Sequence, residues 1–173
     1  KFKILEGAEI IVPAVSWSTT YFPLQQYGLK LKFVDVDLNT LNYNIKALKD
    51  AVTDETRAIM VVNLLGNPND FDAINNIIDG RKIVVIEDNC ESLGAKYKNK
   101  YLGTIGDIGV FSIHETKNLV GGQAGCISIN NKSLTKNPAI NPPAPATSIF
   151  IIFYNNSFNF SLKDAKGNQF NSS

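Results

Sequence analysis

The sequence predicts an α/β fold of three layers, in which a mostly parallel sheet carries helices on both faces. Short continuous apolar segments recur along the chain, and segments of helical length separate them. Continuous apolar strands are typical of parallel strands that are buried on both faces, and alternation with helices produces right-handed crossovers within one sheet. Because ligands bind beyond the carboxyl ends of such strands, the polar residues that follow each strand are the first candidates for a site.

The first half of the chain contains four predicted strands, at residues 9–13, 31–36, 58–62 and 82–86. Helices are expected between them at residues 18–27, 44–52 and 70–78. A cluster of hydroxyl side chains at residues 16–20 suits the cap of the first helix, and Asn69 or Asp70 suits the cap of the third. Trp17, Asn63 and Asp88 would then lie at or near the carboxyl ends of strands.

The second half is expected to begin with a small hairpin at residues 96–103, which turns at Asn99. Two further short strands follow, at residues 108–111 and 126–129, and a connection with three glycines in five positions joins them. Lys117 lies in this connection. A lysine held there is a candidate amine nucleophile, because a partly desolvated amine exposes its lone pair; the alternative is an ordinary solvated loop lysine.

Composition narrows the class of protein. The 173 residues are 44% hydrophobic and 19% charged, with a net charge of +1, which predicts no nucleic-acid partner and no membrane surface. One histidine and two cysteines outside any Cys-x-x-Cys pair predict no metal site. Cys90 and Cys126 are expected to be reduced core residues. No apolar segment has the length of a membrane span, so a cytoplasmic location is expected.

The composition changes near residue 133. Residues 137–148 contain four prolines, which a doubly wound sheet does not accommodate. We therefore expect a core domain at residues 1–133 and a low-complexity tail, unrelated or disordered, at residues 134–173. Residues 149–154 could form one strand, but no pattern after them predicts a partner.

Several separate motifs between residues 7 and 130 resemble the DegT/DnrJ-type family of sugar aminotransferases, fold-type-I enzymes that depend on pyridoxal 5′-phosphate. The motifs are IVP followed by SWSTT, FVDVD, NLLGNP, ED with LGA, GDIG, and FSIHETKN. Their order and spacing carry the resemblance. It implies that residues 1–133 are part of the family's large, cofactor-binding domain. The family's upstream phosphate-binding turn and its smaller carboxyl-terminal domain are not recognised in the sequence.

The resemblance also implies roles for individual residues. Lys117 matches the lysine that forms the Schiff base with the cofactor aldehyde and moves a proton. Asp88 matches the carboxylate that pairs with the pyridine nitrogen, and Trp17 matches the aromatic residue that stacks on the ring. Ser112 matches a hydroxyl that binds the cofactor phosphate. The structural alternatives are a core aromatic for Trp17, a helix cap for Asp88 and a turn residue for Ser112.

The chain departs from the aminotransferase pattern at two places. Glu91 stands where these enzymes usually carry a glutamine near the cofactor phenolic oxygen, and Gln123-Ala124-Gly125 replaces Glu-Gly-Gly. The SWSTT and EDNCES phrases look closer to a sister branch that removes the 3-hydroxyl of nucleotide-linked 4-keto-6-deoxy sugars. That branch replaces the Schiff-base lysine with histidine.

The expected function follows from Lys117. It is transfer of an amino group, with glutamate as the expected donor, to a nucleotide-linked keto-deoxy sugar in cell-surface polysaccharide synthesis. The alternatives are the 3-dehydratase reaction of the sister branch and a non-catalytic fragment or binding module. The resemblance further implies a homodimer for the complete protein.

Overall fold

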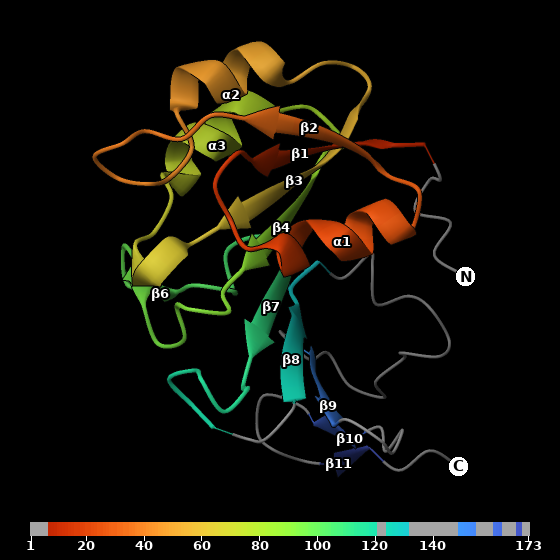
Figure 1. Cartoon of the computed structure of the whole chain (residues 1–173), viewed down its shortest axis with the longest axis vertical. Coiled ribbons are helices and arrows are strands. Elements are labelled where there is room, and N and C mark those ends of the chain that lie inside the picture. Colours follow the sequence, from red (N-terminus) through yellow and green to blue (C-terminus); the bar gives the residue numbers. More distant parts are fainter. Residues whose placement is uncertain (1–6, 121–123, 132–148, 155–160, 164–168, 171–173) are drawn as a thin grey trace.

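The sheet is the centre of the molecule. The computed structural model describes residues 7–120, 124–131, 149–154, 161–163 and 169–170. The strands lie in the order β11-β10-β9-β8-β7-β4-β3-β1-β2 (Figure 1). Five are parallel: β1 (Glu9–Pro13), β2 (Lys30–Val34), β3 (Thr56–Val62), β4 (Val84–Asp88) and β7 (Ile108–Ser112). Strand β8 (Ala124–Ile129) then pairs antiparallel with β7.

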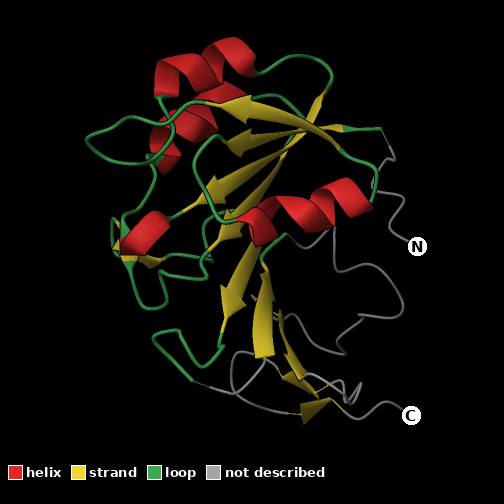
Figure 2. Ribbon diagram, viewed as in Figure 1, coloured by secondary structure: helices red, strands yellow, loops and turns green. Residues whose placement is uncertain are grey.

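Helices cover both faces of the parallel strands, as the sequence predicts (Figure 2). Helix α1 (Ser18–Gln26) packs on one face, where its Tyr21 and Leu24 contact the cluster of Ile10, Val12 and Met60. The other face carries α2 (Ile45–Ala51) and α3 (Phe71–Ile78). The core on this face combines Ile11, Ile59 and Val61, from alternate strand positions, with Leu48 of α2 and Ile74 of α3. The two apolar clusters make the three layers.

Of the two predicted helix caps, the one at Asp70 is confirmed, and Asn44 supplies a further cap that was not predicted. Asn44 accepts a hydrogen bond from the N–H of Ala47, and Asp70 accepts one from the N–H of Ala73, so each side chain caps its helix. The hydroxyl cluster before α1 behaves differently. Trp17 is the capping residue and makes no side-chain bond to the helix. The predicted hydroxyl cap is wrong, because Thr20 bonds elsewhere in the fold.

The hairpin forms where it was predicted. Strands β5 (Lys96–Tyr97) and β6 (Lys100–Tyr101) pair antiparallel. Lys98 and Asn99 join them with φ of 45° and 68°. Positive φ at both central residues is the geometry of a type I′ turn, which matches the twist of a two-stranded ribbon. The η1 turn (Leu64–Gly66) follows β3 and precedes α3.

A buried carboxylate fixes the approach to β7. Glu87 is fully buried and accepts hydrogen bonds from the backbone N–H groups of Gly103, Ile105 and Gly106, at 2.6, 2.8 and 2.6 Å. Gly103 has φ of 85° and packs directly against the ring of Phe111, so a side chain has no room there. Glu87 therefore determines the path of the segment that delivers β7 to the sheet.

The described parts of residues 134–173 form strands. β9 (Ile149–Tyr154) pairs antiparallel with β8 along its whole length, and β10 (Ser161–Lys163) and β11 (Gln169–Phe170) continue the edge. No partner was predicted for residues 149–154, whereas the backbone of β9 pairs on both sides. The proline-rich residues 137–148 lie outside the described residues, and the domain boundary near residue 133 stays a prediction.

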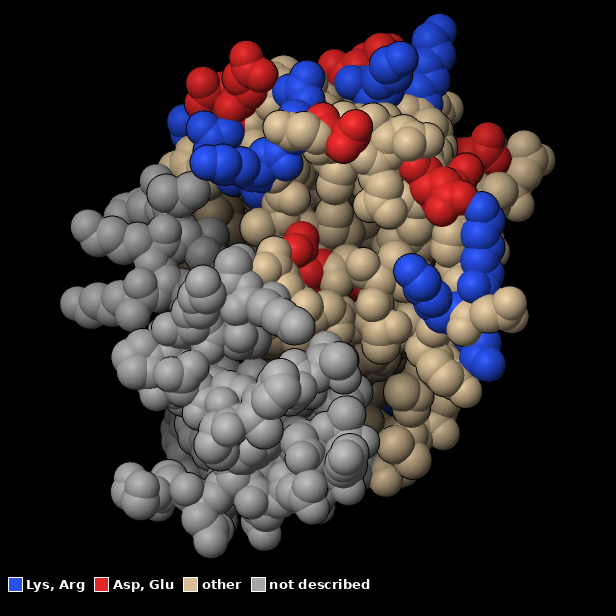
Figure 3. Space-filling view, turned by 180° about the vertical axis from the view of Figure 1, so that it is seen from behind, with Lys and Arg blue, Asp and Glu red and all other residues tan. Residues whose placement is uncertain are grey.

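Charged side chains of both signs are intermixed on the face shown in Figure 3. Among the residues that the structure describes, no helix has the length and apolarity that a bilayer span needs. The same residues contain no group of three or more His, Cys, Asp or Glu side chains placed to hold a metal ion.

Candidate active site

One cavity at the carboxyl edge of the parallel strands brings together every predicted site residue. Its volume is about 670 Å³. It lies beyond the ends of β3, β4 and β7, where ligands of doubly wound sheets bind. Its lining includes all five residues singled out from the sequence: Trp17, Asp88, Glu91, Ser112 and Lys117. Residues from four separate segments therefore meet at one place.

Asp88 is the last residue of β4, and neutral donors hold both of its carboxylate oxygens. The Thr20 hydroxyl donates to Oδ2 at 2.8 Å, and the Cys90 N–H donates to Oδ1 at 3.1 Å. The carboxylate does not cap a helix, so that structural alternative is excluded. We call Thr20 and Asp88 the sheet wall of the cavity.

Trp17 lies at the start of α1 and is 76% exposed. A core aromatic residue would be buried, so the structural alternative for Trp17 is wrong. The indole lines the cavity instead and offers it a flat apolar surface.

Ser112 is the last residue of β7, and its Oγ accepts a hydrogen bond from the N–H of His114 at 3.3 Å. The hydroxyl therefore stabilises the turn that follows β7, as the structural alternative proposed. Because the oxygen acts as an acceptor there, its hydrogen is available to donate into the cavity. A turn role and a ligand role are compatible at this residue.

Lys117 lies opposite, in the loop between β7 and β8. Its backbone N–H donates to the carbonyl of His114 at 2.9 Å, and its Nζ lies 3.6 Å from Oε1 of Glu91. The Lys117 side chain is 27% exposed and that of Glu91 is 40% exposed. Glu91 also accepts from the N–H of Leu65 at 3.4 Å. We call Glu91, His114, Thr116 and Lys117 the loop wall.

Cys90 was expected to be a core residue, but it lines the cavity between the two walls. Burial, together with the charge and hydrogen bond of Asp88, raises the pKa of its thiol to about 12. The Lys117 ammonium and the N–H of Ser112 act in the opposite direction. At neutral pH the thiol is therefore protonated.

Sequence reasoning missed Thr20, Cys90 and His114 as parts of the cavity. The local sequence gave one usable signal, because Thr20 lies one helical turn after Trp17. Cys90 and His114 had none beyond being close in sequence to Asp88 and Lys117.

The chemistry of the lining fits pyridoxal phosphate. The cavity presents a carboxylate that can pair with a ring nitrogen, an aromatic surface for the ring, a hydroxyl for a phosphate and an amine for an aldehyde. These four groups come from Asp88, Trp17, Ser112 and Lys117.

The fold and the lining of this cavity together define a class of proteins, the pyridoxal-phosphate enzymes. The chain belongs to the DegT/DnrJ/EryC1/StrS aminotransferase family, whose model matches residues 1–140. The resemblance read from the sequence motifs is thereby confirmed.

Individual relatives have more specific names than the family. The chain is 58% identical over 134 residues to GDP-4-keto-6-deoxy-D-mannose 3-dehydratase of Escherichia coli O55:H7, which is 78% of this chain and 34% of that protein. It is 37% identical over 131 residues to GDP-perosamine synthase of Escherichia coli O157:H7, covering 76% of this chain and 36% of that protein. The chain thus spans about a third of the length of these relatives.

A solved structure supports the fold. The crystal structure of GDP-4-keto-6-deoxymannose-3-dehydratase with a trapped PLP-glutamate geminal diamine superposes with a TM-score of 0.69 at 63% identity. The match covers 70% of this chain and 32% of that one. The prediction of a partial large domain with a mostly parallel sheet is confirmed, and the expectation of amino transfer now competes with relatives named as dehydratases.

Proposed function

We propose that this chain is the cofactor-binding part of a pyridoxal-phosphate enzyme that acts on a nucleotide-linked 4-keto-6-deoxy sugar. The observation that carries the proposal is the shared cavity of Asp88 and Lys117, with a carboxylate on one wall and an amine on the other. The substrate class rests on the 58% identity to the 3-dehydratase. Such sugars are precursors of cell-surface polysaccharides.

Each residue has a separate task. Pyridoxal phosphate, when bound, supplies an aldehyde that reacts with amines and a ring that accepts electrons from the adjacent carbon. Asp88 pairs with the ring nitrogen and keeps a negative charge beside it. Trp17 covers one face of the ring and excludes water. Ser112 donates a hydrogen bond to the phosphate, and the Nζ of Lys117 carries a proton to and from the reacting carbon.

Removal of the 3-hydroxyl is the first candidate reaction, because the relatives at 58% and 53% identity are both named 3-dehydratases. In this reaction the sugar hydroxyl leaves as water, so a group in the cavity must move a proton. We assign this step to the Nζ of Lys117 on the loop wall. Glutamate remains the proposed source of the amino group for either reaction.

Amino transfer is the second candidate, and the identity of residue 117 favours it. The family resemblance associates lysine here with aminotransferases and histidine with the dehydratase branch. An amine can bond to an aldehyde and also carry a proton, whereas an imidazole only carries the proton. Sequence identity over the whole chain thus favours dehydration, whereas the chemistry of Lys117 favours amino transfer.

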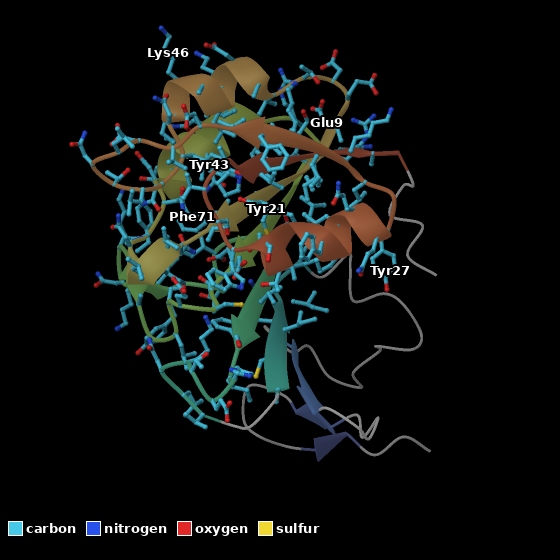
Figure 4. All side chains as sticks on the ribbon, in the orientation of Figure 1. Glu9, Tyr21, Tyr27, Tyr43, Lys46 and Phe71 are labelled. Atoms are coloured by element: carbon cyan, nitrogen blue, oxygen red, sulfur yellow. The ribbon has the colours of Figure 1, made fainter. Side chains whose placement is uncertain are left out.

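The first test concerns the cofactor. We expect the chain, mixed with pyridoxal phosphate and reduced with borohydride, to carry the cofactor on Lys117, located by peptide mass spectrometry. Lys117→Ala should lose this modification. Lys46→Ala is the matched control, because Lys46 is exposed on α2, far from the cavity (Figure 4). Modification spread over surface lysines, unchanged in Lys117→Ala, contradicts the proposal.

The second test separates the reactions. The chain is incubated with pyridoxal phosphate, glutamate and GDP-4-keto-6-deoxymannose, and the sugar products are identified by mass spectrometry. A 3-deoxy sugar supports dehydration, and an amino sugar supports transfer. Lys117→His should favour the deoxy product. Specific cofactor attachment without either product instead supports a non-catalytic binding module.

The complete protein is further proposed to be a cytoplasmic homodimer, which rests on the family resemblance. Sedimentation of the complete protein at several concentrations tests the homodimer, and a monomer at all of them contradicts it.

A further inference from the structure

The hydrogen bond between Thr20 and Asp88 joins two segments that are distant in sequence. Thr20 is 7% exposed, and its hydroxyl lies 2.8 Å from Oδ2 of Asp88. Threonines in the first turn of a helix often bond to the helix backbone. This one bonds instead to the carboxylate that the proposed function assigns to the ring nitrogen.

The Thr20 hydroxyl has a single hydrogen, and this determines which group donates in each of its two side-chain hydrogen bonds. The Oγ of Ser16 lies 3.0 Å from the Oγ1 of Thr20. Since Thr20 uses its hydrogen on Asp88, Ser16 must donate to Thr20. The result is a chain of hydrogen bonds from Ser16 through Thr20 to Asp88. Hydrogen bonds in such a chain polarise and strengthen one another.

The first turn of α1 is itself held in place. The Tyr21 hydroxyl donates to the carbonyl of Pro13 at 2.6 Å, and its ring meets that of Phe33 edge-on at 5.4 Å. Figure 4 shows Tyr21 at the start of α1, next to the sheet. The position of Thr20 therefore follows from contacts with β1 and β2, and does not depend on a ligand.

The carboxylate has a fixed orientation as a result. Thr20 holds one oxygen and the Cys90 N–H holds the other, at 3.1 Å. A carboxylate that had to rotate or desolvate on ligand binding would lose part of its interaction energy, whereas an oriented one does not. Both donors are neutral, so the negative charge is not cancelled by a neighbouring cation.

We propose that Thr20, supported by Ser16, is a positioning residue that orients Asp88 toward the ring nitrogen of the cofactor. The proposal rests on the proposed function, because it assumes that Asp88 meets that nitrogen. Thr20 acts through Asp88 and touches no reacting atom.

Trp17 provides the measurement, because it is the only tryptophan in the chain and lines the cavity. Titration of the full chain with pyridoxal phosphate should quench its fluorescence and yield a dissociation constant. We expect Thr20→Val to weaken binding about tenfold, as for loss of a hydrogen bond to a charged group. Thr20→Ser keeps the hydroxyl and should bind within about threefold of the unsubstituted chain.

A double-mutant cycle distinguishes positioning from a general structural effect. In an Asp88→Asn background, Thr20→Val should change the dissociation constant by less than about twofold, because its partner is already altered. The matched control is Thr56→Val. Thr56 is 2% exposed and its hydroxyl also donates to a carboxylate, that of Glu9 at 2.6 Å, but it lies at the other end of β3. This variant should lower the urea midpoint and leave cofactor binding unchanged.

The outcomes separate the two proposals. No saturable quenching in the unsubstituted chain contradicts the cofactor and, with it, the role of Thr20. Normal binding by Thr20→Val overturns the role of Thr20 alone. An equal loss in the Asp88→Asn background also overturns it, because Thr20 would then act independently of Asp88.

Discussion

The two walls of the cavity are built differently. The sheet wall ends a buried strand, and hydrogen bonds to neutral donors fix its carboxylate. The loop wall lies on a connection in which Leu119 and Val120 are 55% and 63% exposed, and its lysine is held by one backbone bond and one ion pair. The fold thus fixes the carboxylate proposed to pair with the ring nitrogen more firmly than the amine proposed to react with the aldehyde.

This difference has a chemical rationale. A carboxylate that pairs with a ring nitrogen has the same partner throughout a reaction cycle, so a rigid position is favourable. A lysine that would react with the aldehyde of the bound cofactor and also carry a proton would need to change position. Few fixed contacts allow that movement.

Cys90 lies between the walls, so the rate at which its thiol is alkylated depends on Asp88 on one side and Lys117 on the other. The largest change of any prediction is expected in this rate. Thiolate is the reactive form, and a pKa near 12 leaves very little of it at pH 8. We expect alkylation by iodoacetamide, measured in Cys126→Ser, to be roughly 100- to 1000-fold slower in the folded chain than in urea.

The effect of Lys117 on the pKa of Cys90 can be tested in the same assay. Because the Lys117 ammonium lowers the pKa of Cys90, Lys117→Ala should slow the alkylation further. Equal rates for the folded and unfolded chain would show that the thiol is not buried beside Asp88.

The stability of β4, the strand that carries Asp88 of the sheet wall, is tested at Glu87. Glu87→Gln replaces an acceptor of three N–H bonds by a group that is partly a donor, so one N–H loses its partner. The free energy of unfolding should fall by about 3 kcal/mol, measured by urea denaturation. Glu55→Gln is the control, since Glu55 is exposed. A loss of the same small size in both variants would contradict the assigned role.

The smallest effect is expected on the loop wall. Glu91→Gln removes the ion pair with Lys117, whose partners are 27% and 40% exposed. Exposed pairs contribute little, so the free energy of unfolding should change by less than about 1 kcal/mol. A larger loss in urea denaturation would mean that the loop wall is as firmly built as the sheet wall.

The sequence predicted much of the fold because its signals are local. Apolar runs located the parallel strands, and Asp70, one of the two predicted candidates, caps α3. Motif resemblance located Asp88, Trp17, Ser112 and Lys117, and the rule for parallel sheets indicated that they would meet.

What could not be predicted depends on contacts between distant segments. Thr20 and Asp88 are 68 positions apart, and no periodicity links them. Local reasoning assigned the hydroxyls near residue 18 to a helix cap, and tertiary contacts overrode that preference. Cys90 looked like a core residue because its apolar neighbours resemble a core segment, whereas its position at a strand end faces the cavity.

Glu87 and Asp88 are adjacent, and adjacent residues of a strand point to opposite faces of the sheet. One carboxylate is therefore enclosed by three backbone N–H groups while the next faces the cavity. Insertion of one residue in β4 before Glu87 would move Glu87 to the position that faces the cavity and leave the enclosed position without its charge. The three N–H groups that bond to Glu87 thus fix the register of β4. They thereby determine which of the two acidic residues faces the cavity.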